Sequence, residues 1–108
     1  MKISVIVPIY NERDSLEALY DSLVPVLEGM GGAYEIVLAN DGSTDGSAAM
    51  LDELAQRNRS IKVVHLRRNY GQTAAMMAAI QHSSGDVIVP MDGDLQNDPA
   101  DIPKPVSY

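Results

Sequence analysis

The stretch Ile3-Ser-Val-Ile-Val-Pro-Ile9 decides the fold, because it is a short and nearly continuous run of β-branched residues. Such a run predicts a strand that is buried on both faces, as in a parallel sheet covered by helices. We therefore predict a strand over Ile3–Pro8. The run is far shorter than the roughly 20 apolar residues of a membrane span. It also lacks the cleavage site of a signal peptide.

Strand-like runs and helix-like segments alternate along the rest of the chain. Strands are predicted at Tyr34–Ala39, Ile61–Leu66 and Asp86–Met91, the last of them buried, and helices over about Leu16–Met30, Thr44–Asn58 and Thr73–His82. The third helix is rich in Ala and Met, so it is narrow enough to pack closely on a sheet. Short loops imply right-handed crossovers. The pattern therefore predicts an α/β fold with a parallel sheet between helix layers and strand order 3-2-1-4.

Local signals suggest where the helices begin and end. Asn11 is predicted to cap the first helix, and Pro25 is predicted to kink it or end it early. Glycines at positions 29, 31 and 32 are predicted to terminate it. Ser43 or Thr44 is predicted to cap the second helix.

Composition limits the classes of function. The 108 residues, 45% of them hydrophobic, are enough for a single globular domain, 1–108, with a modest core. The chain has no cysteine, which excludes a disulfide framework and fits a reducing, cytoplasmic compartment. Its formal net charge of −7 argues against nucleic acid as a partner, since that needs clustered Lys and Arg. An acidic protein that binds phosphates would need a metal ion as intermediary.

Concentrated polar residues follow directly after each predicted strand. The four motifs are Tyr10-Asn-Glu12, Asn40-Asp-Gly-Ser-Thr-Asp-Gly46, Arg67-Arg-Asn-Tyr-Gly-Gln72 and Asp92-Gly-Asp-Leu-Gln96. In an open parallel sheet, ligands bind at the carboxyl ends of the strands, near the switch point between strands 1 and 4. We therefore expect the four motifs to form one site.

Asp92 and Asp94 carry two carboxylates one residue apart in a turn opened by Gly93. Like charges that close repel each other, and a hard divalent cation such as Mg²⁺ or Mn²⁺ removes the conflict. A metal held there could bridge to the phosphates of a nucleotide. The alternative is an acidic surface turn.

Three side chains in the other motifs are candidates for binding a nucleotide. Asp41 could accept a hydrogen bond from a base N–H, although the segment could also be only a capped turn. Tyr10 could border a base or be a core aromatic. Arg68 could bind phosphate, whereas we expect Arg67 to lie in solvent.

Other nucleotide and metal motifs fit poorly. The spacing from Asp41 to Asp52 imitates a calcium loop, but a β-run precedes it and its last residue is not Glu. No GxGxxG follows the first strand, so dinucleotide binding is disfavoured. His65 and His82 have no partner that the sequence identifies, and neither is assigned a function.

The four motifs together resemble the inverting family-2 glycosyltransferases with the GT-A fold. The matching segments are Val5–Glu12, Asp41–Gly46, Arg68–Gln72 and Met91–Pro99. The last segment is similar to the branch that transfers sugars to polyprenyl phosphates, the dolichyl- and undecaprenyl-phosphate type. The resemblance implies a three-layer, Rossmann-like GT-A fold, and this chain would be its nucleotide-binding half, truncated at the C-terminal side.

The resemblance also implies roles for single residues. Pro8, Tyr10 and Glu12 would line the nucleoside pocket, Asp41 would bind the base, and Arg68 and Gly71 would shape the wall of the donor site. Asp92 would lie near the ribose, sugar or metal, Asp94 would bind the metal at the diphosphate, and Gln96 would complete its ligands, with Asp92 and Asp94 as the catalytic pair. The family often has a second Asp where this chain has Asn40, so we expect Asn40 itself to be dispensable.

The function implied is metal-dependent, inverting transfer of a sugar from a UDP- or GDP-linked donor to a polyprenyl phosphate. The full-length relatives would be membrane-associated, and this chain alone is expected to bind the donor but to transfer little sugar. Two alternatives are a receiver domain, which would need an Asp where Arg67 and Arg68 stand, and a non-catalytic nucleotide-binding or assembly module with an exposed sheet edge. The sequence leaves a homo-oligomer open.

Overall fold

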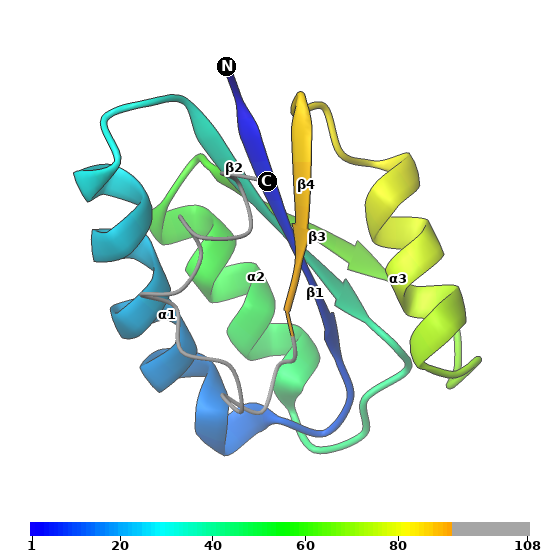
Figure 1. Ribbon diagram of the computed structural model, residues 1–108. Helices are drawn as coiled ribbons and strands as arrows, with labels where there is room; N and C mark the ends of the chain where they lie inside the picture. The colour runs from blue at the N-terminus through cyan, green and yellow to red at the C-terminus, as the bar shows by residue number, and fades with distance from the viewer. Residues whose placement is uncertain (92–108) are drawn as a thin grey trace.

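A computed structural model describes residues 1–91 of the chain. Its elements are β1 (Ile3–Ile9), α1 (Arg13–Gly29), β2 (Tyr34–Asn40), α2 (Ser47–Arg57), β3 (Ile61–His65), α3 (Gln72–Gln81) and β4 (Val87–Pro90). The strands form one parallel sheet in the order β3-β2-β1-β4. Helices α1 and α2 cover one face and α3 covers the other (Figure 1). The predicted α/β fold, strand order and switch point are confirmed.

Strand β1 lies in the middle of the sheet and is buried on both faces, as predicted. Val5, Val7 and Ile9 belong to the core beneath α1 and α2, and Ile6 belongs to the core beneath α3. Helix α3 buries Ala75 and Ala79 against the sheet. Side chains this small let the helix approach closely, so the prediction of a narrow helix is also confirmed.

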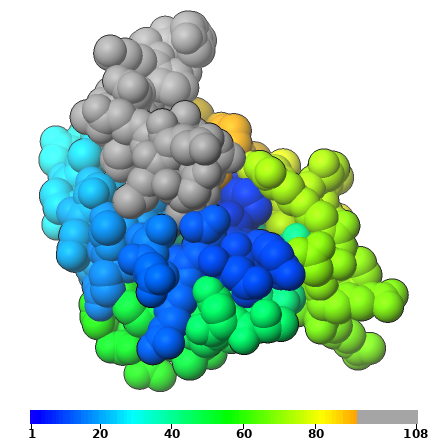
Figure 2. Space-filling view, turned by 90° about the horizontal axis from the view of Figure 1, so that it is seen from below, coloured from blue at the N-terminus to red at the C-terminus, as the bar shows by residue number. Residues whose placement is uncertain are grey.

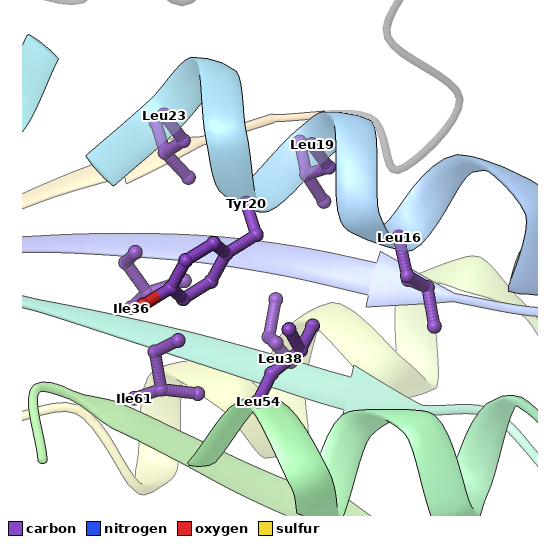
Figure 3. A pocket seen from close by; sticks show the side chains of 8 residues that line it. All are labelled: Leu16, Leu19, Tyr20, Leu23, Ile36, Leu38, Leu54 and Ile61. Carbon is purple, nitrogen blue, oxygen red and sulfur yellow. The ribbon is translucent and has the colours of Figure 1, made fainter. Parts of the chain in front are cut away.

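A small apolar cavity remains in the larger core, between α1, α2 and the sheet (Figure 3). It is lined by Leu16, Leu19, Tyr20, Leu23, Ile36, Leu38, Leu54 and Ile61. Its volume of about 10 Å³ is at the lower limit for one water molecule, and its lining is almost wholly apolar. This cavity is therefore packing space and not a site for a nucleotide.

Strand β4 is more exposed than the sequence predicted. Val89 is buried, but Ile88 is 40% exposed and Pro90 is also exposed. Within the described residues β4 pairs with β1 and forms an edge of the sheet. The prediction of a buried strand failed because an apolar run does not reveal how many neighbours a strand has.

The predicted start of α1 at Asn11 was wrong. The residue before α1 is Glu12, which makes no side-chain cap, and Asn11 binds the loop after β2 instead. Helix α1 also continues through Pro25 to Gly29, so Pro25 does not end it. Pro25 lies on the exposed face, where the carbonyl that loses its partner can be hydrated. Gly31 follows with a φ of 77°, as expected for a glycine that terminates a helix.

The predicted cap of α2 was also wrong. The helix begins at Ser47 and not near Thr44, and its first residue is preceded by Gly46 with a φ of 93°. Asp45 accepts a hydrogen bond from the backbone N–H of Ser47 and thereby satisfies a helix donor. Ser43 is used elsewhere, because its hydroxyl accepts from the backbone of Asn11.

The amino ends of the strands are joined by the buried carboxylate of Glu35. It accepts hydrogen bonds from the Ser4 hydroxyl and from the Ser84 backbone, and Lys62 Nζ lies 2.9 Å from it. Lys2 Nζ is 3.7 Å away. Burial alone would raise the pKa of Glu35, but these hydrogen bonds and the Lys62 charge outweigh it and lower the pKa to about 2. The network fastens the connection between α3 and β4 to β1 and β2.

Candidate functional site

The loops after β1, β2 and β3 meet at the carboxyl edge of the sheet, as the sequence predicted. Figure 2 shows this edge, with the loop after β1 in blue beside the green loop after β2 and the yellow-green start of α3. In the register of the sheet, Asn40 lies opposite Ile9 on one side and opposite His65 on the other. The fourth motif, Asp92 to Gln96, lies outside the described residues.

The loop after β1 is fastened to the loop after β2 through Asn11. Its backbone N–H donates to Ser43 Oγ at 3.0 Å, and its side-chain oxygen accepts from the Thr44 N–H at 2.8 Å. Asn11 has a φ of 50°, a conformation that Asn tolerates better than most residues. These bonds hold Tyr10, the residue before it, at a fixed place on the edge.

The loop after β2 is fastened to the loop after β3 through Asp41. Its two carboxylate oxygens accept from the backbone N–H groups of Tyr70, at 2.7 Å, and Gly71, at 3.0 Å. The side chain is only 3% exposed. Since a buried carboxylate needs hydrogen bonds to offset its lost hydration, these two bonds are what allow Asp41 to be buried here.

Gly42 brings the same two loops still closer. It has a φ of 68°, and a Cβ atom at this position would lie 2.3 Å from the backbone carbon of Arg68 and 2.4 Å from the nitrogen of Asn69. No side chain fits there without moving the loop. The turn predicted at Asp41-Gly-Ser43 is therefore a contact between two loops and not a simple helix cap.

Asp41 was predicted to bind a nucleotide base, and that role stays a prediction. The carboxylate is already bound to the loop after β3, but each oxygen has a second lone pair with which it can accept another hydrogen bond.

Tyr10 is not a core aromatic, because its side chain is 46% exposed at the end of β1. Pro8 is half-buried within β1, and Glu12 is half-buried directly before α1. These three residues from the predicted nucleoside pocket lie along one strand end, next to the Asn11 contact with the loop after β2.

The loop after β3 presents a cation and an aromatic ring. The Arg68 guanidinium lies over the Tyr70 ring, 5.2 Å from its centroid, and both residues are exposed. Arg67 is exposed as well, as expected. Gly71, with a φ of 103°, directly precedes α3. Tyr70 was not among the predicted site residues, although an aromatic residue so close to Arg68 in a polar motif was a usable signal.

Asn40 was expected to be dispensable, but it is buried and bonded on both sides of its amide. Its side-chain oxygen accepts from the Ser43 N–H at 3.0 Å, and its nitrogen lies 3.0 Å from the ring of His65. The sequence contained no signal for this pair, because the two residues are 25 positions apart.

The predicted metal ligands Asp92, Asp94 and Gln96 lie outside the described residues. Within residues 1–91, no group of three or more His, Asp or Glu side chains is arranged to hold a metal ion. Of the predicted site, the described residues therefore include those assigned to the nucleoside and to the wall of the donor site, and these roles stay predictions.

A family model described as "Glycosyl transferase family 2" matches residues 4–108. The chain belongs to this family. Among curated members it is 49% identical, over 103 residues, to an undecaprenyl-phosphate 4-deoxy-4-formamido-L-arabinose transferase of Edwardsiella ictaluri (strain 93-146). The match covers 94% of this chain and 32% of that protein. The chain thus spans about a third of the length of this relative.

Similar solved structures have the same fold. TarS 1–349 from S. aureus, in complex with UDP-GlcNAc, matches with a TM-score of 0.73 and 28% identity, over 99% of this chain and 30% of that one. The mannosyltransferase PcManGT from Pyrobaculum calidifontis, in complex with GDP-Man and Mn²⁺, matches with a TM-score of 0.72 and 26% identity, over 85% and 27%. The predicted GT-A fold and the predicted family are confirmed.

Proposed function

We propose that this chain forms the donor-binding part of a glycosyltransferase that moves a sugar from a UDP- or GDP-linked donor to a polyprenyl phosphate, with inversion at the sugar. The observation that carries the proposal is the buried carboxylate of Asp41, which is held at the carboxyl edge of the sheet. Tyr10 is exposed at the same edge, at the end of β1. The acceptor class is suggested by the name of the relative that is 49% identical, an undecaprenyl-phosphate transferase.

In this proposal the described residues bind the nucleoside. The Tyr10 ring borders the base, and Pro8 and Glu12 complete that side of the pocket. Asp41 accepts a hydrogen bond from a base N–H with an oxygen lone pair that the loop does not use. Arg68 and Gly71 form the opposite wall, where the guanidinium supplies positive charge for the phosphates.

Mg²⁺ or Mn²⁺ would be held by Asp94, with Gln96 and Asp92 completing the ligands. Carboxylate and amide oxygens are the donor atoms that these cations prefer, and one similar solved structure contains Mn²⁺. When bound, the cation would neutralise charge that develops on the departing nucleotide diphosphate. The acceptor phosphate is already an anion, so the reaction needs little help from a general base.

Donor binding should be separable from sugar transfer, because the chain spans about a third of its curated relative. We expect the purified 108-residue chain to bind a nucleotide diphosphate and to transfer little or no sugar. The acceptor being a lipid, we expect the whole enzyme to act at the cytoplasmic face of a membrane. Within residues 1–91, no helix has the length and apolar character that crossing a bilayer requires.

Calorimetric titration with UDP and with GDP, each with and without Mn²⁺, tests the proposal. We expect one of the two to bind and Mn²⁺ to strengthen that binding. Asp94→Ala should remove the metal-dependent part of the affinity and leave thermal unfolding unchanged. Asp21→Ala removes an exposed carboxylate from α1 and serves as the matched control. If neither nucleotide binds under any of these conditions, the proposed function is wrong.

A non-catalytic assembly module is the second candidate, and the exposure of β4 favours it. Ile88 and Pro90 lie on that strand in contact with solvent, and an exposed strand edge can pair with another chain. Sedimentation at increasing protein concentration separates the two candidates. Self-association without any nucleotide affinity would favour the assembly module.

A further inference from the structure

His65 connects helix α2 to the loop that carries Asp41. Its Nε2 lies 2.8 Å from Asp52 Oδ1 on α2, and its Nδ1 lies 3.0 Å from Asn40 Nδ2 on β2. Asn40 and His65 are directly opposed in the register of β2 and β3, so both side chains point to the face covered by α1 and α2.

The neighbouring bonds determine where the proton on His65 lies. The Ser43 N–H donates to Asn40 Oδ1, which leaves the NH₂ group of Asn40 facing the imidazole. An amide NH₂ can only donate, so His65 Nδ1 must be the acceptor and carries no proton. The proton is then on Nε2, from which it is donated to Asp52. The contacts on both sides of the ring select the same neutral tautomer.

Asn40 and Asp41 are neighbours in the chain, and their side chains are bonded on opposite sides of β2. Asn40 is bonded to His65 on the face of α1 and α2, whereas Asp41 is bonded to the start of α3 on the other face. Each is only 3% exposed. Because the two residues share one stretch of backbone, the orientation of the Asn40 amide limits how Asp41 can point.

We propose that His65 is a positioning residue for the donor site. Its imidazole carries the proton on Nε2, which is bonded to Asp52, and accepts from the Asn40 amide through Nδ1. In this way His65 fixes the orientation of the Asn40 amide and, through it, the turn that carries Asp41. The expected effect of His65 on nucleotide binding rests on the proposed function. The contact of His65 with Asn40 and its effect on the loops do not depend on that function.

Replacement of Asn40 by Asp tests the direction of the hydrogen bond between Asn40 and His65. A carboxylate at this position can accept from Ser43 but cannot donate to His65 Nδ1. The ring would then sit between two carboxylates, at positions 40 and 52, so Nδ1 would face an acceptor and not a donor. The ¹⁵N shifts of the imidazole should therefore report a proton on Nε2 and none on Nδ1 in the wild type, and a proton on Nδ1 in Asn40→Asp.

Three histidine variants test the positioning role. His65→Leu removes both ring contacts, His65→Gln keeps an acceptor for the Asn40 amide, and His82→Leu is the matched control at the far end of α3. One readout is hydrogen exchange of the amides of Ser43, Tyr70 and Gly71, which needs no ligand. The other is the dissociation constant of whichever of UDP and GDP binds the wild type.

We expect His65→Leu to speed exchange at all three amides and to raise the dissociation constant about tenfold, the loss of roughly one hydrogen bond. His65→Gln should recover most of both effects, and His82→Leu should show neither. If His65→Leu does not fold, Asp52→Ala, which changes an exposed side chain, should produce a smaller effect in the same direction.

Unchanged exchange and affinity in His65→Leu, or a wild-type ring with its proton on Nδ1, would overturn the inference. A wild-type chain that binds neither nucleotide, but whose amides respond to His65→Leu as expected, would refute the proposed function and leave the positioning role supported. The two failures are therefore distinguishable.

Discussion

Single residues decide how closely the loops of the site approach one another. Gly42 has no side chain at the point where the backbone of Arg68 passes, and Asp41 accepts hydrogen bonds from the backbone N–H groups of Tyr70 and Gly71 further along that loop. The two residues act together, since the carboxylate reaches Tyr70 and Gly71 only while the loop can come that near.

Gly42→Ala should therefore release the loop after β3. The new Cβ would overlap the backbone of Arg68, and the φ of 68° would be strained for Ala. We expect a loss of stability of about 1–3 kcal/mol and a drop in nucleotide affinity of at least about tenfold. Urea unfolding and calorimetry measure the two effects.

Gly32→Ala is the matched control, because the nearest atom to its added Cβ is the Met1 carbonyl oxygen at 3.6 Å, an ordinary contact. Equal stability and affinity in Gly42→Ala and Gly32→Ala would mean that the close approach of the two loops does not matter for binding.

The two ends of the sheet are built differently. The carboxyl ends carry the interlocked loops of the site, whereas the amino ends are joined by the Glu35 network. Glu35 bonds β2 to Ser4 of β1, to the segment before β4 and to Lys62 of β3. The charge of one carboxylate therefore contributes to the alignment of every strand.

Stability should fall in acid because of Glu35. Its pKa is about 2 in the folded chain and 4.5 is its ordinary value, so the stabilisation is complete above pH 4.5. Between pH 4.5 and about 2 the unfolded chain binds a proton that the folded chain does not, and the free energy of unfolding decreases. Urea unfolding between pH 7 and pH 3 should show this slope.

Glu35→Gln should flatten that slope and cost about 2 kcal/mol at pH 7, the range for hydrogen bonds to a charged group. Glu53→Gln breaks an exposed ion pair with Arg57 and should cost well under 1 kcal/mol. A Glu35→Gln variant with the acid sensitivity of the wild type would show that another carboxyl group is responsible.

The strands could be predicted from the sequence because their apolar runs report burial directly, and β1 is the clearest case. The helix starts could not be predicted in this way. Asn11 and Ser43 are residue types that commonly cap helices, but here each is bonded to the other's loop. Local propensity does not distinguish a side chain that caps its own helix from one bonded to a neighbour. The same limit explains β4, whose exposure depends on neighbouring strands and not on its own residues.

The location of the candidate site at the carboxyl edge of the sheet could be predicted, but the contacts between its residues could not. Because ligands bind at the carboxyl ends of parallel strands, the loops that carry Tyr10, Asp41 and Arg68 could be assigned to one edge of the sheet. The pairing of His65 with Asn40 follows from the register between β2 and β3, which no short sequence motif encodes. The roles of Asp92 and Asp94 remain predictions.

The whole chain and its proposed ligand have net charge of the same sign. The net charge is −7, and a nucleotide diphosphate is also an anion. Arg67 and Arg68 supply positive charge close to the edge, but the charge of the chain as a whole stays negative. Long-range repulsion should therefore slow the encounter of the two in the absence of a divalent cation.

Salt should accelerate that encounter, because it screens the repulsion over distances longer than the Debye length. Without metal, the association rate of a fluorescent nucleotide diphosphate should rise about two- to threefold between 20 mM and 200 mM salt. Stopped-flow fluorescence measures the rate, and an uncharged nucleoside with the same label is the control. A rate that falls with salt would mean that the arginines dominate the field near the site.

The place of Asp41 against the amino terminus of α3 has a consequence for how a diphosphate is bound. In many α/β proteins the partial positive charge of a helix dipole at this end attracts a phosphate. Here an internal carboxylate already occupies the backbone donors of Tyr70 and Gly71. The dipole of α3 is thus compensated within the protein, and the charge of the pyrophosphate in the proposed donor would have to be balanced by guanidinium groups or by a metal ion.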